Sequence, residues 1–99
     1  MDREALVAEW FELTRVRMPA CASARGWPVR FDHCFQRILL DNAVGAKWAE
    51  VITAPAYRNA DQHILERAIA LGREAIAGEA DLSDLNRKSL AWRGKLRGT

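Results

Sequence analysis

The residues most able to do chemistry lie between positions 27 and 42. If this stretch is helical, five of its polar or ionisable side chains fall within about 100° of one another, beside an apolar arc. Guanidinium groups offer forked donors to an anion, and a thiol next to a cation becomes a better nucleophile. We therefore take as candidate ligand-binding residues Arg30, His33, Cys34, Arg37 and Asp41.

Two kinds of chemistry fit this stripe. In the first, Arg30 and Arg37, helped by His33, bind an anion such as a phosphate. In the second, Cys34 is the nucleophile of a small enzyme. His33 is then poorly placed as its base, because neighbouring residues on a helix point about 100° apart. His63 could be the base only if its own helix packs nearby.

A metal site is not expected. Cys21, His33, Cys34 and His63 are residue types that bind zinc, but their spacing matches no standard zinc pattern. No nucleotide-binding glycine motif or metalloprotease motif occurs either, so the sequence predicts no cofactor.

A structural interpretation of the same stripe stands beside these hypotheses. Arg37 and Asp41 are four residues apart, which favours a simple surface ion pair on a helix. Cys34, at the border of the apolar arc, suits a small core residue, and His33 would then sit at the rim.

The second candidate region is the basic C-terminal end. From Leu85 onward the chain has five basic residues and no acidic one, an asymmetry that is typical of an anion-binding end. Cations on the outer face of a helix could contact the phosphates of a nucleic acid, whereas Trp92 is expected to pack inward. A solubilising tail is the plainer alternative. The candidate nucleic-acid-binding residues are Arg87, Lys88, Arg93 and Lys95.

Residues 27–38 and 85–95 resemble segments of small bacterial proteins, some of which are labelled acetyltransferases. The resemblance covers about a quarter of the chain and brings no activity with it. That label would require a mixed sheet and a glycine-rich pyrophosphate loop, and this sequence shows neither. We therefore carry over no catalytic residues from the resemblance.

The elements that would position these residues are all helical. Apolar spacing predicts one helix from about Asp2 to Met18, ended by Pro19, and a loop over 19–29. Further helices are predicted from Val29 or Arg30 to about 43, over 46–52, from 59 or 61 to 77, and after 81 or 83. A turn is predicted over 54–58, where Tyr57 is either a substrate contact or a packing residue. The prediction is an all-α, compact bundle of four to five helices with short loops.

Within these helices, Gly72 falls on a predicted apolar stripe, where it would let another helix approach closely. Gly94 and Gly98 predict that residues 93–99 fray at the C-terminus.

Composition limits the function. The 99 residues are 49% hydrophobic and 28% charged, which fits one folded domain over 1–99. Two cysteines cannot make a disulfide framework, and we find no signal peptide and no stretch that could span a membrane. We therefore expect a small cytoplasmic binding module for an anionic partner, nucleic acid included. The alternatives are a module for protein interaction or homo-oligomer formation, which four tryptophans favour, and a small enzyme.

Overall fold

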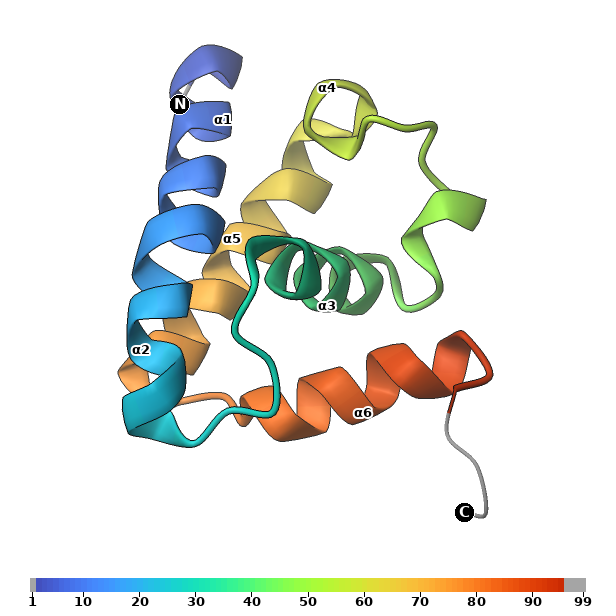
Figure 1. Cartoon of the computed structure of the whole chain (residues 1–99). Coiled ribbons are helices and arrows are strands. Elements are labelled where there is room, and N and C mark those ends of the chain that lie inside the picture. Colours follow the sequence, from blue (N-terminus) through green and yellow to red (C-terminus); the bar gives the residue numbers. More distant parts are fainter. Residues whose placement is uncertain (1, 96–99) are drawn as a thin grey trace.

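The structure, a computed structural model, describes residues 2–95 and shows the predicted all-helical architecture (Figure 1). The first three elements, α1, η1 and α2, follow one another without a break and are counted here as one helix. On this count the described residues form five helices and no strand. No described helix is both long and apolar enough to cross a bilayer. The elements are α1 (Arg3–Glu12), η1 (Leu13–Arg17), α2 (Met18–Arg25), α3 (Asp32–Val44), η2 (Trp48–Glu50), α4 (Ala56–Asn59), α5 (Gln62–Ala77) and α6 (Leu82–Trp92).

The first helix is longer than the sequence predicts. It does not stop at Met18 but continues to Arg25, so the predicted loop over 19–29 is wrong for its first seven residues. The reason lies in η1, a π-helical turn in which the Met18 amide donates to the carbonyl of Leu13, five residues back. Pro19 follows in the first turn of α2, where its missing N–H breaks no helical hydrogen bond.

The next helix begins later than predicted. Phe31 is its extended N-cap residue and α3 starts at Asp32, so Arg30 lies in the preceding loop and not on the helix. The predicted end is confirmed, because Gly45 adopts the left-handed conformation that closes the helix at φ 75°. Trp27, in the loop before this helix, packs against the core, with its ring edge-on to Phe35 and the two ring centres 5.7 Å apart.

The connection from α3 to α5 also differs from the prediction. The predicted short helix over 46–52 is a single 3₁₀ turn at Trp48–Glu50, and the predicted turn over 54–58 contains α4. Ile52 points inward, whereas Val51 is 58% exposed. Figure 1 shows this segment curving away from α3 and returning toward α1, so that α4 lies beside the first helix.

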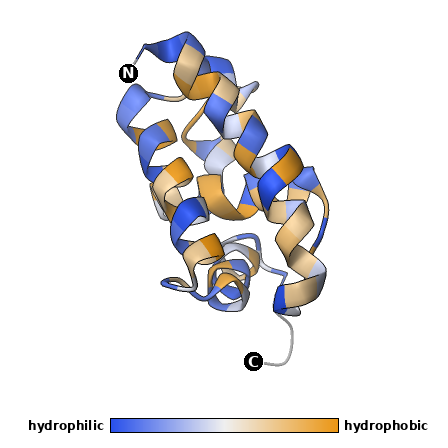
Figure 2. Cartoon of the chain, turned by 90° about the vertical axis from the view of Figure 1, so that its left-hand side faces the viewer, coloured by the Kyte–Doolittle hydropathy of each residue, from blue (hydrophilic) through white to orange (hydrophobic). Residues whose placement is uncertain are grey.

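The core forms around α3, whose Phe35, Ile38 and Leu39 are fully buried. Figure 2 shows hydrophobic and hydrophilic residues alternating along each helix, as expected where each helix buries one face. Gly72 of α5 does permit the predicted close approach. A β-carbon at this position would lie 2.6 Å from a methyl carbon of Leu13, and Leu13 is itself fully buried.

Candidate functional site

The predicted stripe is divided by the structure. Arg30 is exposed, lies with its guanidinium 5.8 Å from the ring centre of Phe31, and lines a shallow pocket with Trp27. His33 is exposed and stacks on Phe31 with an angle of 4° between the rings. These residues therefore surround the N-terminus of α3 instead of forming a row along it.

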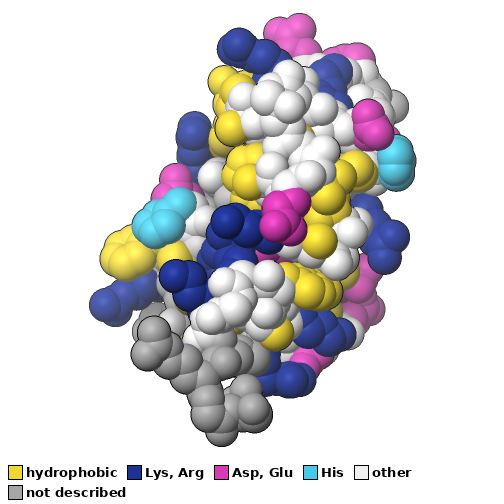
Figure 3. Space-filling model, turned by 90° about the vertical axis from the view of Figure 1, so that its right-hand side faces the viewer, with side chains coloured by type: hydrophobic (Ala, Val, Ile, Leu, Met, Phe, Trp, Pro, Cys, Tyr) yellow, Lys and Arg dark blue, Asp and Glu magenta, His cyan; other side chains and the backbone are white. Residues whose placement is uncertain are grey.

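Cys34 has no catalytic surroundings in the structure. Its side chain is half-buried, its thiol is free, and it lines neither the pocket at Arg30 nor the three pockets described below. His63 is exposed at the start of α5, and the two histidines of the chain appear at opposite edges of the face in Figure 3. No group of three metal-ligating side chains occurs among residues 2–95.

Arg37 and Asp41 do not form the predicted surface pair. Asp41 is fully buried and binds the C-terminal helix instead. One carboxylate oxygen accepts from the Ser89 hydroxyl at 2.6 Å and from the Nε of Arg93 at 2.7 Å. The other accepts from Nη2 of Arg93 at 3.0 Å and from the backbone amide of Trp48 at 2.9 Å. The carboxylate thus fastens both α6 and η2 to α3.

Arg37 also faces α6, but its partners there are neutral. Its two terminal nitrogens donate to the Ser89 hydroxyl at 2.7 Å and to the side-chain carbonyl of Asn86 at 2.9 Å. Within residues 2–95 no carboxylate forms an ion pair with it. The guanidinium is therefore held firmly from one side while its charge has no direct counter-ion.

The candidate nucleic-acid-binding residues are mostly engaged within the protein. Arg87 and Lys88 both pair with Asp84, and the hydrogen bond from Lys88 is the main reason that the pKa of this carboxyl lies below its usual range. Arg93 is bound to Asp41, so only Lys95 of the four is exposed with no ion pair among the described residues. Arg97 and Gly98 lie outside those residues.

Two further features of the surface bear on nucleic-acid binding. Trp92, the last residue of α6, was predicted to pack inward, but it is 40% exposed. In Figure 3, lysine and arginine side chains are scattered among acidic, hydrophobic and neutral ones and do not gather into one basic patch on that face.

The pocket that collects cationic side chains lies between α1, α3 and the segment from η2 to α4. We call it the α1–α3 pocket; it has a volume of about 340 Å³. His33, Arg37 and Arg15 line it, together with the amide of Gln36 and the buried side chain of Leu40. No aspartate or glutamate is among its lining residues. An anion entering it would therefore meet guanidinium groups without facing a lining carboxylate.

Four aromatic side chains complete the wall of the α1–α3 pocket. They come from α1, η2 and α4 and are Trp10, Phe11, Trp48 and Tyr57. The rings of Phe11 and Tyr57 meet edge to face with centres 5.2 Å apart. The guanidinium of Arg15 lies over the ring of Phe11 at 3.9 Å from its centre. A cation on a ring face is favoured electrostatically, so this contact fixes where Arg15 lies.

The π turn explains how the first helix supplies Arg15 as well as the aromatic residues. A turn with hydrogen bonds five residues apart holds one residue more than an α turn. Residues five apart therefore come closer to one face, which brings Arg15 toward the side of Trp10. Thr14, fully buried in this turn, donates to the carbonyl of Trp10 and accepts from Gln36 of α3 at 3.0 Å. These contacts join the π turn to α3 at the pocket.

Asp32 lies near the pocket and offsets part of its charge. Its carboxylate lies 3.8 Å from Nε of Arg15 and 3.7 Å from Nδ1 of His33. Both pairs are exposed, so each contributes little to stability. Asp32 thus pairs with Arg15 and His33 but not with Arg37. Among the described residues, no acidic side chain forms an ion pair with Arg37.

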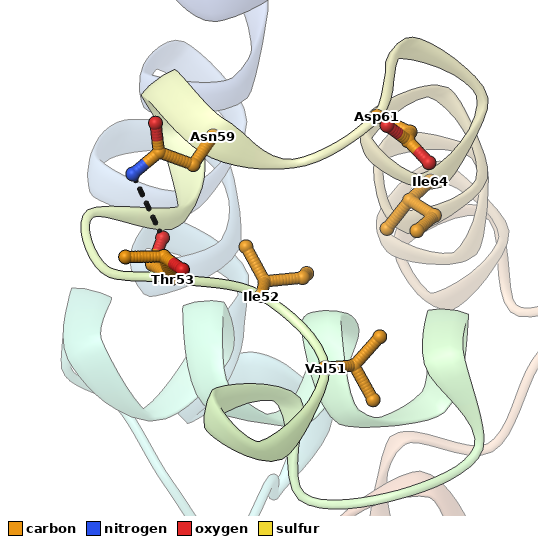
Figure 4. A pocket seen from close by; sticks show the side chains of 6 residues that line it. All are labelled: Val51, Ile52, Thr53, Asn59, Asp61 and Ile64. Atoms are coloured by element: carbon orange, nitrogen blue, oxygen red, sulfur yellow. Dashed lines mark hydrogen bonds between the residues drawn. The ribbon is translucent and has the colours of Figure 1, made fainter.

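Two further pockets contain carboxylates, whereas the pocket at Trp27 has one cation, Arg30, and no carboxylate. The pocket in Figure 4, about 420 Å³, has one ionisable lining residue, Asp61, and the amide of Asn59 is already bound to the Thr53 carbonyl at 2.9 Å. A third pocket, about 650 Å³, is lined by Asp2 and Glu4 beside its arginines. Carboxylates in both would repel an anion.

Comparison with known proteins adds no function. No family model, no curated protein and no solved structure matches the chain. The resemblance to small bacterial proteins therefore has no support beyond the two segments in which it was noticed. Any functional argument has to come from the geometry of the side chains.

Sequence reasoning found only part of the α1–α3 pocket. It named Arg37 and His33, and it considered Tyr57 as a substrate contact, but it missed Arg15 and the tryptophans. The apolar spacing of Trp10 and Phe11 indicated core residues, which Trp10 also is at 2% exposure. One signal in the sequence could have indicated the pocket. The first helix contains both aromatic and basic residues, and so does the next helix.

Proposed function

We propose that the protein is a small cytoplasmic module that binds an anionic ligand in the α1–α3 pocket. The observation behind this proposal is the state of Arg37, a half-buried guanidinium held by two neutral partners with no carboxylate paired to it. Removing a charge from water is costly unless an opposite charge compensates for it. Two of its five N–H donors are used within the protein, so others remain to bind an anion.

Acetate is a suitable first probe, with acetamide as its neutral counterpart. We expect acetate to shift the indole N–H signals of Trp10 and Trp48 in a saturable way in nuclear magnetic resonance spectra recorded at constant ionic strength. Arg15→Gln should weaken this binding, because it removes one cation and leaves the contacts of Arg37 with α6 intact. Arg67→Gln, an exposed arginine of α5 outside the pocket, is the matched control. Equal shifts with acetamide, or unchanged binding by Arg15→Gln, would contradict the proposal.

A nucleic acid is the second candidate for the anionic partner, and it would bind at the basic C-terminal end instead of in the pocket. The support for it is the exposed part of that end. Lys95 is exposed, whereas Arg87 and Lys88 share one carboxylate. Contacts with phosphates release counter-ions, so such binding would weaken steeply as salt is added. Salt-sensitive binding of an oligonucleotide that persists in Arg15→Gln would place the function on this end and not in the pocket.

A further inference from the structure

We infer that the ligand of the α1–α3 pocket is a flat aromatic ring bearing a single carboxylate. This inference rests on the anion-binding function proposed above and adds the chemical class of the ligand. Its basis is the combination, in one pocket, of four aromatic side chains with a single cation that lacks a counter-ion.

The ring follows from the walls of the pocket. Phe11 and Tyr57 already meet edge to face, and the half-buried Trp48 also lines the pocket. Aromatic rings attract one another in offset or edge-to-face geometry beyond their hydrophobic contact. A volume of about 340 Å³ is at the small end of the usual range for ligand sites, which suits one ring system and its substituent.

The single charge follows from the balance of nearby ionic groups. Of the two arginines that line the pocket, Arg15 has Asp32 near it, whereas Arg37 has no carboxylate paired with it among residues 2–95. One monoanion would neutralise it. A carboxylate also matches the forked N–H donors of a guanidinium, because its two oxygens can each accept one hydrogen bond.

Three probes of similar size separate the ring from the charge. Benzoate carries both, cyclohexanecarboxylate keeps the charge without the aromatic ring, and benzamide keeps the ring without the charge. We expect benzoate to bind most tightly in calorimetric titrations at constant ionic strength. Cyclohexanecarboxylate should bind about threefold to tenfold more weakly, and benzamide at least about tenfold more weakly because it loses the charge-assisted hydrogen bonds.

A variant of the wall tests the ring directly. Trp48→Leu keeps an apolar side chain, and the backbone amide that binds Asp41 is retained. It should lower the preference for benzoate over cyclohexanecarboxylate, because one aromatic wall of the pocket is lost. The spectra of the free variant, compared with those of the wild type, report whether it remains folded. Phe31→Leu, an exposed aromatic residue outside the pocket lining, should leave the preference unchanged.

The outcomes distinguish this inference from the function on which it rests. If cyclohexanecarboxylate binds as tightly as benzoate, the aromatic ligand is wrong and the anion site stands. If benzamide binds as tightly as benzoate, the charge has no role and both statements are wrong. If benzoate does not bind while acetate does, the inference alone is overturned.

Discussion

At Asp41, four hydrogen bonds replace the water that a carboxylate loses when it is buried. Two of these bonds come from one guanidinium, that of Arg93, in the forked arrangement that suits a carboxylate. A buried pair of this kind adds little net stability compared with apolar residues, but removing one partner leaves the other charge unpaired. Asp41 is thus needed for the docking of α6.

This role predicts a large effect of Asp41→Asn. The variant keeps the size of the side chain but leaves the Arg93 guanidinium without its counter-charge, so we expect the free energy of unfolding to fall by about 3–5 kcal/mol. Urea denaturation measures this change. Asp61→Asn alters an exposed aspartate whose side chain caps no amide, and it should cost less than about 1 kcal/mol. A loss of similar size in both variants would show that the buried network is not what holds α6.

The sequence could not predict this network, although it named three of its members. The four-residue spacing of Arg37 and Asp41 favours a local pair, and nothing in that spacing reports that α6 brings Ser89 and Arg93 to the same place. The partners are about fifty positions apart in the chain. Such pairings depend on how helices pack, which a local pattern does not contain.

Among the elements, α5 and the π turn meet at Gly72. A valine there would push its methyl groups into Leu13 and Leu39, which are both fully buried. We therefore expect Gly72→Val to lower the free energy of unfolding by about 1–3 kcal/mol through overpacking, measured by urea denaturation. Ala70→Val, an exposed position on the same helix, is the control for the helix propensity of valine. Equal losses in the two variants would mean that the close approach does not matter.

Three helix boundaries were predicted correctly from single residues. Gly45, Gly78 and Asp81 mark ends or beginnings through their own backbone or side-chain geometry, and the structure confirms all three. Pro19 was wrongly taken as the end of the first helix. A proline interrupts a regular helix, but the π turn before it widens the hydrogen-bond spacing, and that widening depends on buried contacts such as those of Thr14.

The surface of the whole molecule bears on the alternative that the protein forms oligomers. Among residues 2–95, the large exposed hydrophobic side chains are spread over four separate segments: Val16, Phe31, Val51 and Trp92. Scattered apolar side chains are normal on a monomer, whereas an interface needs a contiguous patch. We expect light scattering to give the mass of a single chain, 11.2 kDa. A mass of two or more chains, lowered by Trp92→Ala but not by Lys95→Ala, would support the oligomer hypothesis instead.

Arg37 touches two regions at once, since it lines the α1–α3 pocket and holds α6 through Ser89 and Asn86. Binding free energies that share one residue are linked reciprocally. An anion bound to this guanidinium would stabilise the docking of the C-terminal helix. A mutation that destabilises this docking would lower the affinity for the anion by the same factor. Occupancy of the pocket would therefore change the stability of the C-terminal helix without any change of fold.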